Sequence, residues 1–122
     1  MDHSPRNPYF RNPNDVLRFL LSMSKFNELI NGNQPVLVDF YADWCQPCKM
    51  MAPILEEAKS ELGNSVRIIK VDTDKNQQVS MKYGIRGIPT LILFQNGQIK
   101  WRQSGVVPKD MIVQNIKNSV EI

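Results

Sequence analysis

The sequence has few cysteines, few histidines and no long apolar run, and each shortage excludes a class of protein. Its 122 residues include 2 cysteines and 1 histidine. Two cysteines are too few for a disulfide-stapled scaffold, and a bond between Cys45 and Cys48 would constrain little of the unfolded chain because its loop is very small. No stretch approaches the roughly 20 apolar residues of a transmembrane helix. The chain is therefore expected to have no membrane partner.

A strong charge of either sign is also missing. The formal net charge is +3, and the basic residues form no run of five or more. So small an excess, spread along the chain, predicts no nucleic-acid partner. Hydrophobic residues make up 42% and charged residues 22%, as in ordinary globular proteins, and the length suits one buried core.

The first 14 residues are expected to form an irregular arm, because they contain three prolines and three asparagines. Residues 15–122 are then expected to form one domain. The segment Val16–Leu21 comes nearest to a signal-peptide core, but it is short and Arg18 interrupts it. We therefore expect a cytoplasmic protein, with export as the alternative if the N-terminal segment is a signal remnant.

The spacing of the apolar residues predicts alternating helices and strands. A parallel βαβ unit is followed by a hairpin, whose turn is indicated by Asn96 and Gly97. The expected fold class is α/β, with one central mixed sheet and helices on both faces. Helices are expected at about residues 15–30 (in one or two pieces, broken near Ser22–Ser24), 47–62, 75–83 and 108–120, and strands at 36–42, 66–72, 89–94 and 99–103.

Three methionines are interpreted as core side chains rather than as parts of a cofactor site: Met50, Met51 and Met81. Trp101, on the returning strand of the hairpin, is expected either to be half-buried or to form a contact site.

The two cysteines lie where a predicted strand passes into a predicted helix. The first turn of a helix exposes unpaired N–H groups and a positive dipole end, which stabilise a thiolate. Cys45 is then expected to attack a disulfide, and Cys48, one turn further, to act as the resolving thiol. Two buried structural cysteines are an alternative. Half of a zinc site is another, but zinc takes four ligands and only His3 remains, so that site would need a second chain.

Asp39 and Lys70 interrupt strands that are otherwise apolar. Burial of a carboxylate is costly and raises its pKa. The strand of Asp39 leads to Cys45, so its carboxylate can serve as a general base for Cys48. A structural role for Asp39 and a snorkelling strand-end role for Lys70 are the alternatives. Pro89 can begin a strand because no N–H is needed there.

Taken together, these residues resemble the thioredoxin family. The resemblance covers about residues 24 to 120, in order and at the spacings of the family. Its matching pieces are Val38–Met50, Ala52–Leu55, Lys70–Asp72, Tyr83–Thr90, Phe94–Gly97 and Gly105.

The resemblance implies the thioredoxin fold and a role for each matched residue. Cys45 falls on the nucleophile, Cys48 on the resolving cysteine, and Asp39 with Lys70 on a buried proton-transfer pair. Pro89 falls on a cis-proline beside the disulfide, and the backbone of Ile88 on a hydrogen-bonding site for an extended substrate peptide. The implied substrate-binding residues are Trp44, Gln46, Pro47, Gly87, Ile88, Gly105 and Val106.

The implied activity is that of a protein-disulfide reductase. No metal and no bound cofactor are expected, and electrons are expected from NADPH through a flavin-dependent thioredoxin reductase. The expected partners are that reductase and disulfide-containing client proteins, and the chain is expected to be a monomer. The alternatives are an exported oxidant or maturation factor, and a binding subunit that uses the apolar rim.

Two departures from the family pattern are visible. Gln46 stands where the family usually has glycine, and residues between the cysteines affect the relative stability of thiolate and disulfide. The arm before about residue 15 has no match.

Overall fold

The computed structural model describes residues 13–122. Residues 1–12, most of the predicted arm, lie outside the described part, so the division of the chain near residue 15 stays a prediction. The elements in chain order are α1 (Pro13–Ile30), β1 (Val36–Tyr41), α2 (Gln46–Leu62), a 3-10 helix η1 (Gly63–Ser65), β2 (Arg67–Asp72), α3 (Gln77–Lys82), β3 (Thr90–Gln95), β4 (Gln98–Ser104) and α4 (Lys109–Ser119).

The described strands form one mixed sheet with the order β2-β1-β3-β4. Strand β1 is parallel to β2 and antiparallel to β3, which forms a hairpin with β4. Asn96 and Gly97 in the hairpin turn have φ of 53° and 76°, the left-handed region that this turn requires. The α/β fold class and the mixed sheet predicted from the sequence are therefore confirmed.

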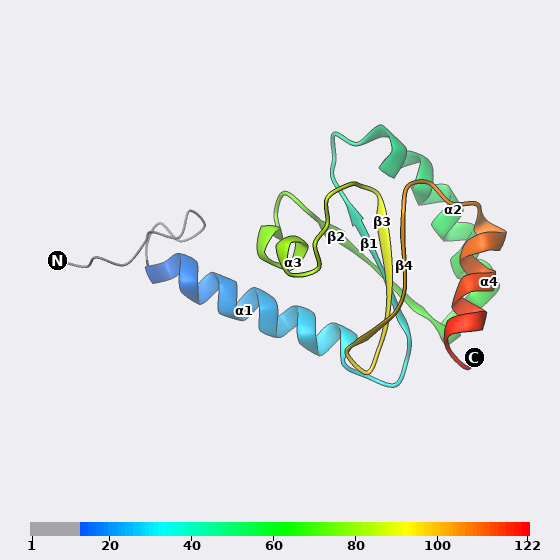
Figure 1. The fold of residues 1–122 in the computed structure, drawn as a ribbon, viewed down its shortest axis with the longest axis horizontal. Helices are drawn as coiled ribbons and strands as arrows, with labels where there is room; N and C mark the ends of the chain where they lie inside the picture. Colours follow the sequence, from blue (N-terminus) through cyan, green and yellow to red (C-terminus); the bar gives the residue numbers. More distant parts are fainter. Residues whose placement is uncertain (1–12) are drawn as a thin grey trace.

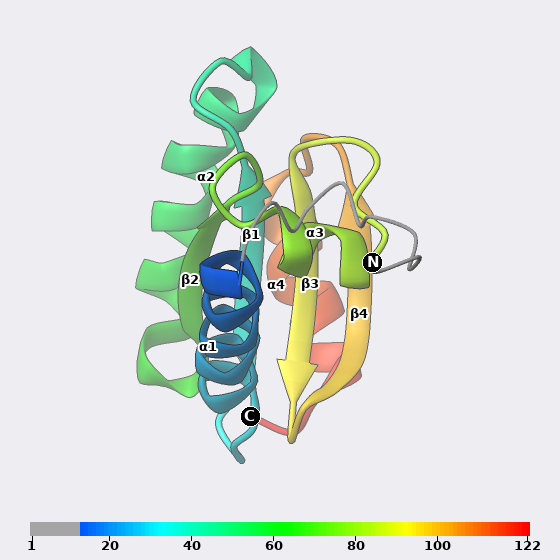
Figure 2. The same ribbon diagram turned by 90° about the vertical axis from the view of Figure 1, so that its left-hand side faces the viewer.

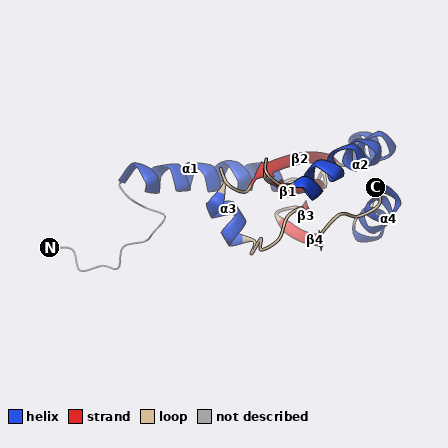
Figure 3. Cartoon of the chain, turned by 90° about the horizontal axis from the view of Figure 1, so that it is seen from above, coloured by secondary structure: helices blue, strands red, loops and turns tan. Residues whose placement is uncertain are grey.

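Helices cover both faces of the sheet. Helices α2 and α4 pack against one face, and α1 with α3 lies on the other (Figures 1, 2 and 3). Alternate residues of β1 therefore enter two different cores: Leu37 belongs to the α2/α4 core, whereas Val36, Val38 and Phe40 belong to the α1/α3 core. This explains why β1 reads as apolar without alternation.

An aromatic cluster joins three elements in the α1/α3 core. The ring of Phe26 in α1 lies 5.8 Å from the ring of Phe94 in β3, and Tyr83, just after α3, lies 5.5 and 5.2 Å from the two. These centroid distances suit favourable edge-to-face and tilted contacts. The cluster fixes the end of α3 against the sheet, which matters for the loop that follows.

Two expectations about side chains and helices were wrong. Helix α1 continues through Ser22–Ser24 without a break, because serine is only mildly unfavourable in a helix and Phe26 and Ile30 anchor the following turns in the core. Met50 and Met81 are 61% and 54% exposed, whereas Met51 is fully buried. Met50 and Met51 are consecutive in α2, so only one of them can face the sheet.

Trp101 is half-buried and packs against the α2/α4 core. No helix in residues 13–122 combines the length and the hydropathy that crossing a membrane requires.

The paired methionines of α2 give a direct check of this packing. Met51→Ala should lower the free energy of unfolding by about 2 to 5 kcal/mol, because it removes a fully buried side chain and leaves a cavity. Met50→Ala, at an exposed position in the same helix turn, should change it by less than about 0.5 kcal/mol. Urea denaturation of both variants measures the difference, and equal losses would contradict the assigned faces of α2.

Candidate active site

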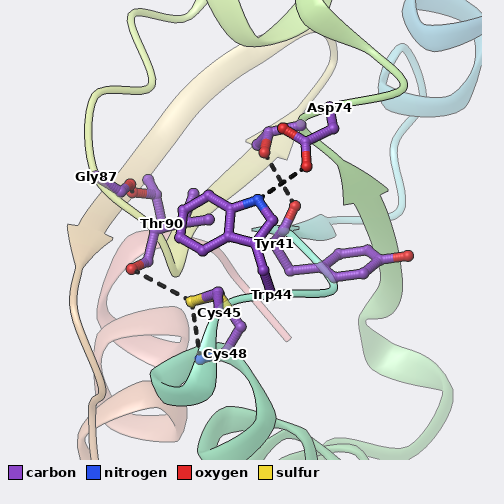
Figure 4. Close-up of a disulfide and its surroundings, with 9 residues drawn as sticks. Tyr41, Trp44, Cys45, Cys48, Asp74, Gly87 and Thr90 are labelled. Atoms are coloured by element: carbon purple, nitrogen blue, oxygen red, sulfur yellow. Dashed lines mark hydrogen bonds between the residues drawn. A yellow bond between two sulfur atoms is a disulfide. The ribbon is translucent and has the colours of Figure 1, made fainter.

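The cysteine pair sits at the start of α2, just beyond the end of β1. Cys45 is the N-cap of the helix, with φ −87° and ψ 108°. The backbone N–H of Cys48 donates a hydrogen bond of 3.2 Å to the Sγ of Cys45. The two residues form a disulfide across Cα atoms 5.3 Å apart (Figure 4). Gln46 and Pro47 fill the first helical positions, where the missing N–H of proline costs nothing.

This cap places a sulfur where a helix favours negative charge. Once the disulfide is reduced, a Cys45 thiolate would accept the Cys48 N–H bond and lie at the positive end of the helix dipole. In the disulfide form Cys45 and Cys48 are only 3% and 5% exposed, so exposure does not distinguish their roles. The hydrogen bond from the Cys48 N–H does distinguish the two cysteines, because only the Cys45 sulfur accepts it.

Asp39 lies fully buried on the sheet face that α2 and α4 cover. In the sheet it is flanked by Lys70 on β2 and Leu91 on β3. Neither carboxylate oxygen has a hydrogen-bond partner among the described residues. Burial raises the pKa of Asp39 from the ordinary value of 3.8 to about 6, and the positive charge of Lys70 offsets part of that rise.

Lys70 differs from its expected place in a buried pair. Its residue is exposed, and its Nζ lies 4.8 Å from the centroid of the Tyr41 ring, a cation–π contact. No ion pair joins it to Asp39 within the described chain. Register explains both observations, because the two residues are partners across β1 and β2, but β2 is the edge strand and its lysine reaches solvent.

A cavity of about 220 Å³ lies between Lys70 and Cys48. Cys48 forms part of its wall. The complete lining is Tyr41, Ala42, Asp43, Cys48, Lys49, Ala52 and Lys70. Cys48 and the exposed Lys70 therefore border the same cavity.

The predicted proline lies on the other side of the disulfide. The Ile88–Pro89 peptide bond is cis, as the resemblance implies. Cys45 Sγ lies 3.8 Å from the carbonyl oxygen of Ile88, and the backbone N–H of Gly105 donates a bond of 2.8 Å to the carbonyl of Pro89. The start of α2 and the loop at Ile88 thus meet at the disulfide, and the loop at Gly105 lies against Pro89.

The predicted substrate-binding residues lie around this junction. Trp44 is 70% exposed and Ile88 is half-buried. The remaining members are exposed: Gln46, Pro47, Gly87, Gly105 and Val106. The structure thus brings together residues that lie far apart in the sequence.

Two residues of the site escaped the sequence analysis. Asp74 Oδ2 accepts a 2.9 Å hydrogen bond from the indole Nε1 of Trp44 (Figure 4). Thr73 Oγ1 donates a 3.1 Å bond to the carbonyl of Tyr41. Both follow the end of β2. Because parallel β1 and β2 end at one edge of the sheet, the position of Asp74 just after β2 was the available signal.

Among the described residues, no group of three or more His, Cys, Asp or Glu side chains is placed to hold a metal ion. The chemistry that the site offers is the exchange of a dithiol for a disulfide, because its reactive groups are the two sulfurs of Cys45 and Cys48.

Comparisons with known proteins agree with this site. The thioredoxin family model matches residues 18–118. The chain is 42% identical over 93 residues to the thioredoxin of Rickettsia bellii (strain RML369-C), covering 76% of this chain and 89% of that protein. It is 40% identical over 102 residues to Thioredoxin Y, chloroplastic, of Oryza sativa subsp. japonica, covering 83% of this chain but only 61% of that longer protein.

Solved structures give the same result. A mutant thioredoxin from Halobacterium salinarum NRC-1 superposes with a TM-score of 0.72 at 34% identity, over 81% of this chain and 86% of that one. Oxidized mitochondrial Thioredoxin 3 from Saccharomyces cerevisiae also superposes with a TM-score of 0.72. The sequence identity is 31%, and the match covers 79% of this chain and 89% of that one. This protein therefore belongs to the thioredoxin family, a family of thiol–disulfide oxidoreductases.

Proposed function

We propose that this protein reduces disulfide bonds in client proteins, cycling between the Cys45–Cys48 dithiol and disulfide. The observation that carries the proposal is the capping of α2 by the Cys45 sulfur, which accepts the Cys48 N–H at 3.2 Å. A helix start that stabilises a thiolate favours attack by Cys45, and the nearby cysteine can then release the product.

The reaction transfers two electrons in two exchanges. The Cys45 thiolate attacks one sulfur of the client disulfide, so that a bond from Cys45 to the client forms and the other client sulfur leaves as a thiolate. Cys48 then loses its proton, and its thiolate attacks Cys45 Sγ. The mixed disulfide breaks, the second client sulfur leaves reduced, and the Cys45–Cys48 disulfide of the structure remains.

Asp39 is proposed to receive the proton of Cys48. Its carboxylate lies on the sheet face that α2 covers, and Cys48 is among the buried residues of α2. A pKa raised to about 6 lets the group accept and return a proton near neutral pH. Lys70 is proposed to adjust that pKa through its charge rather than to join a buried ion pair.

Clients are proposed to dock on the exposed rim around the disulfide. Trp44, Gly87, Gly105 and Val106 are exposed. Trp44 precedes Cys45, Gly87 precedes Ile88 at the disulfide, and Gly105 donates to the carbonyl of Pro89. The backbone N–H of Ile88 has no hydrogen-bond partner among the described residues, so it can pair with an extended client segment. Gln46 and Pro47, at the exposed start of α2, complete this surface.

Further features of the proposal rest on family membership and the sequence. Electrons would come from NADPH through a thioredoxin reductase, with no cofactor bound to this chain, which would act as a monomeric electron carrier. The proposed compartment is the cytoplasm. A relative named as chloroplastic shows that family members occupy different compartments, so this point rests on the sequence alone.

The reduction potential distinguishes the proposed reductase from an exported oxidant. The potential needs to be measured because Gln46, in the exposed first turn of α2, lies between the two cysteines. We expect a potential near −270 mV, about that of thioredoxin, after equilibration in dithiothreitol or glutathione buffers. A potential near about −180 mV or higher would instead support an oxidant or isomerase.

Replacing each cysteine separately should give different outcomes. Cys45→Ser should abolish reduction of insulin disulfides, because it removes the thiolate that the start of α2 stabilises for the first attack. Cys48→Ser should still attack but should accumulate the mixed disulfide, which non-reducing electrophoresis detects. Native turnover by Cys45→Ser would exclude the proposed nucleophile and favour the binding-subunit alternative.

Asp39→Asn should stabilise the protein increasingly as pH rises. The folded protein holds the Asp39 proton more tightly than the unfolded chain, since its pKa is about 6 rather than 3.8. The stability that goes with protonation is therefore present below pH 3.8 and is lost as pH rises through 6. Asparagine does not titrate, so its advantage over aspartate should grow by about 2 kcal/mol between about pH 4 and pH 7.

Urea unfolding of the wild type and Asp39→Asn at a series of pH values measures this change. The variant should also release mixed disulfides more slowly, because Cys48 loses its proton acceptor. A stability difference that does not vary with pH would refute the raised pKa, and an unchanged release rate would refute the proton transfer.

A further inference from the structure

Strand β4 holds the loop that carries Ile88 and Pro89. Arg102 of β4 donates hydrogen bonds through Nη1 to the carbonyl of Tyr83 and through Nη2 to the carbonyl of Gly84, the latter at 2.9 Å. In Figure 2, α3 lies across β3 and extends toward β4 at the edge of the sheet. One guanidinium thus joins the edge strand to the start of the loop.

The two carbonyls need a donor from outside their own helix. Helix α3 ends at Lys82 and Tyr83 is its C-cap, so the carbonyls of Tyr83 and Gly84 follow the hydrogen-bonded turns. Gly84 has φ +61°, in the left-handed region that glycine adopts readily and that ends a helix. Guanidinium is a rigid fork that can serve two acceptors at once, whereas a lysine ammonium is a single point donor.

Packing in the hydrophobic core also holds Tyr83 in place. The ring of Tyr83 lies in the aromatic cluster with Phe26 and Phe94, and the N–H of Ile85 donates a 2.9 Å bond to the carbonyl of Ser80. The backbone at the entry of the loop is therefore fixed by an aromatic side chain in the core and by an arginine on the surface.

The exit of the loop is attached to the same strand. Thr90 Oγ1 donates a 2.6 Å bond to the carbonyl of Gly87 and lies 2.9 Å from Ser104 Oγ, and Gly105 donates to the carbonyl of Pro89. Residues 102–105 thus hold both ends of the loop, while the N–H of Ile88 between them has no partner in the described chain.

We propose that Arg102 is a positioning residue for client docking. Its two hydrogen bonds fix the start of the loop. The backbone of Ile88 is thereby held beside the disulfide, with the Ile88 carbonyl oxygen 3.8 Å from Cys45 Sγ. The inference rests on the proposed reduction of client disulfides. Because Arg102 does not touch the disulfide, it acts on the docking of extended polypeptides and not on sulfur exchange itself.

This role predicts a separation between two kinds of substrate. A protein disulfide must place its flanking backbone against the loop, whereas a small aromatic disulfide needs only the sulfur of Cys45. A purely structural arginine would either affect both substrates alike or affect neither.

The experiment compares Arg102→Met, Arg102→Lys and the control Lys100→Met. Lys100 is an exposed cation on the same strand, and its side chain makes no hydrogen bond or ion pair within the described part of the chain. The fully reduced proteins are mixed with insulin or with 5,5′-dithiobis(2-nitrobenzoate), and the rates are followed as a function of substrate concentration.

Arg102→Met should raise the KM for insulin about 3- to 10-fold with little change in kcat, the size expected for loss of one or two charged hydrogen bonds at an exposed site. Its rate with the small disulfide and its reduction potential should stay at the wild-type values. The KM of Arg102→Lys for insulin should lie between those of the wild type and Arg102→Met, and the KM of Lys100→Met should match that of the wild type.

Equal losses on both substrates, or no loss on insulin, would overturn the positioning role. If Arg102→Met does not fold, as judged by its thermal transition, the same comparison is made with Arg102→Lys, which keeps the charge and part of the contact. Failure of the proposed function itself is recognised separately, because the wild type would then reduce neither substrate.

Discussion

The first turn of α2 is closed by a sulfur atom, and the functional arrangement depends on that turn. Cys45 takes the position that serine, threonine or aspartate usually occupies at a helix start, and its Sγ accepts the N–H of Cys48. The helix cap and the redox pair are thus one feature. The buried residues of α2 fix the helix against the sheet, so the packing of the core determines where the sulfur lies.

A buried carboxylate lowers the stability of this fold. Asp39 occupies a fully buried position in the central part of the sheet, where an apolar residue would be more stable, and no described hydrogen bond compensates for it. The two apolar cores on either side of β1 allow the protein to tolerate this loss. The same burial raises the pKa of Asp39 to about 6, close to neutral pH.

The parts of the site that could be predicted from the sequence depend on local signals. The Asn96-Gly97 turn, the apolar run of β1 and the cysteines at a strand–helix junction each identify themselves within a few residues. The exposure of Lys70 follows instead from the edge position of β2, which depends on the strand order. Asp74 hydrogen-bonds a residue 30 positions away in the sequence, and Arg102 bonds residues 18 and 19 positions away. Only the folded structure reveals such distant partners. The helix faces of Met50 and Met81 likewise depend on which side packs.

The outer edge of β4 has features that oppose pairing with a second extended chain. An exposed sheet edge is a template to which another chain can add as a strand, and this leads to aggregation. Along β4 that edge carries Lys100 and Arg102, and its pairing with β3 is irregular between Leu93 and Phe94. Charges and an uneven register both oppose strand addition. An extended polypeptide is thus disfavoured along this edge of the sheet, whereas the docking proposed above would use the backbone N–H of Ile88, which has no partner in residues 13–122.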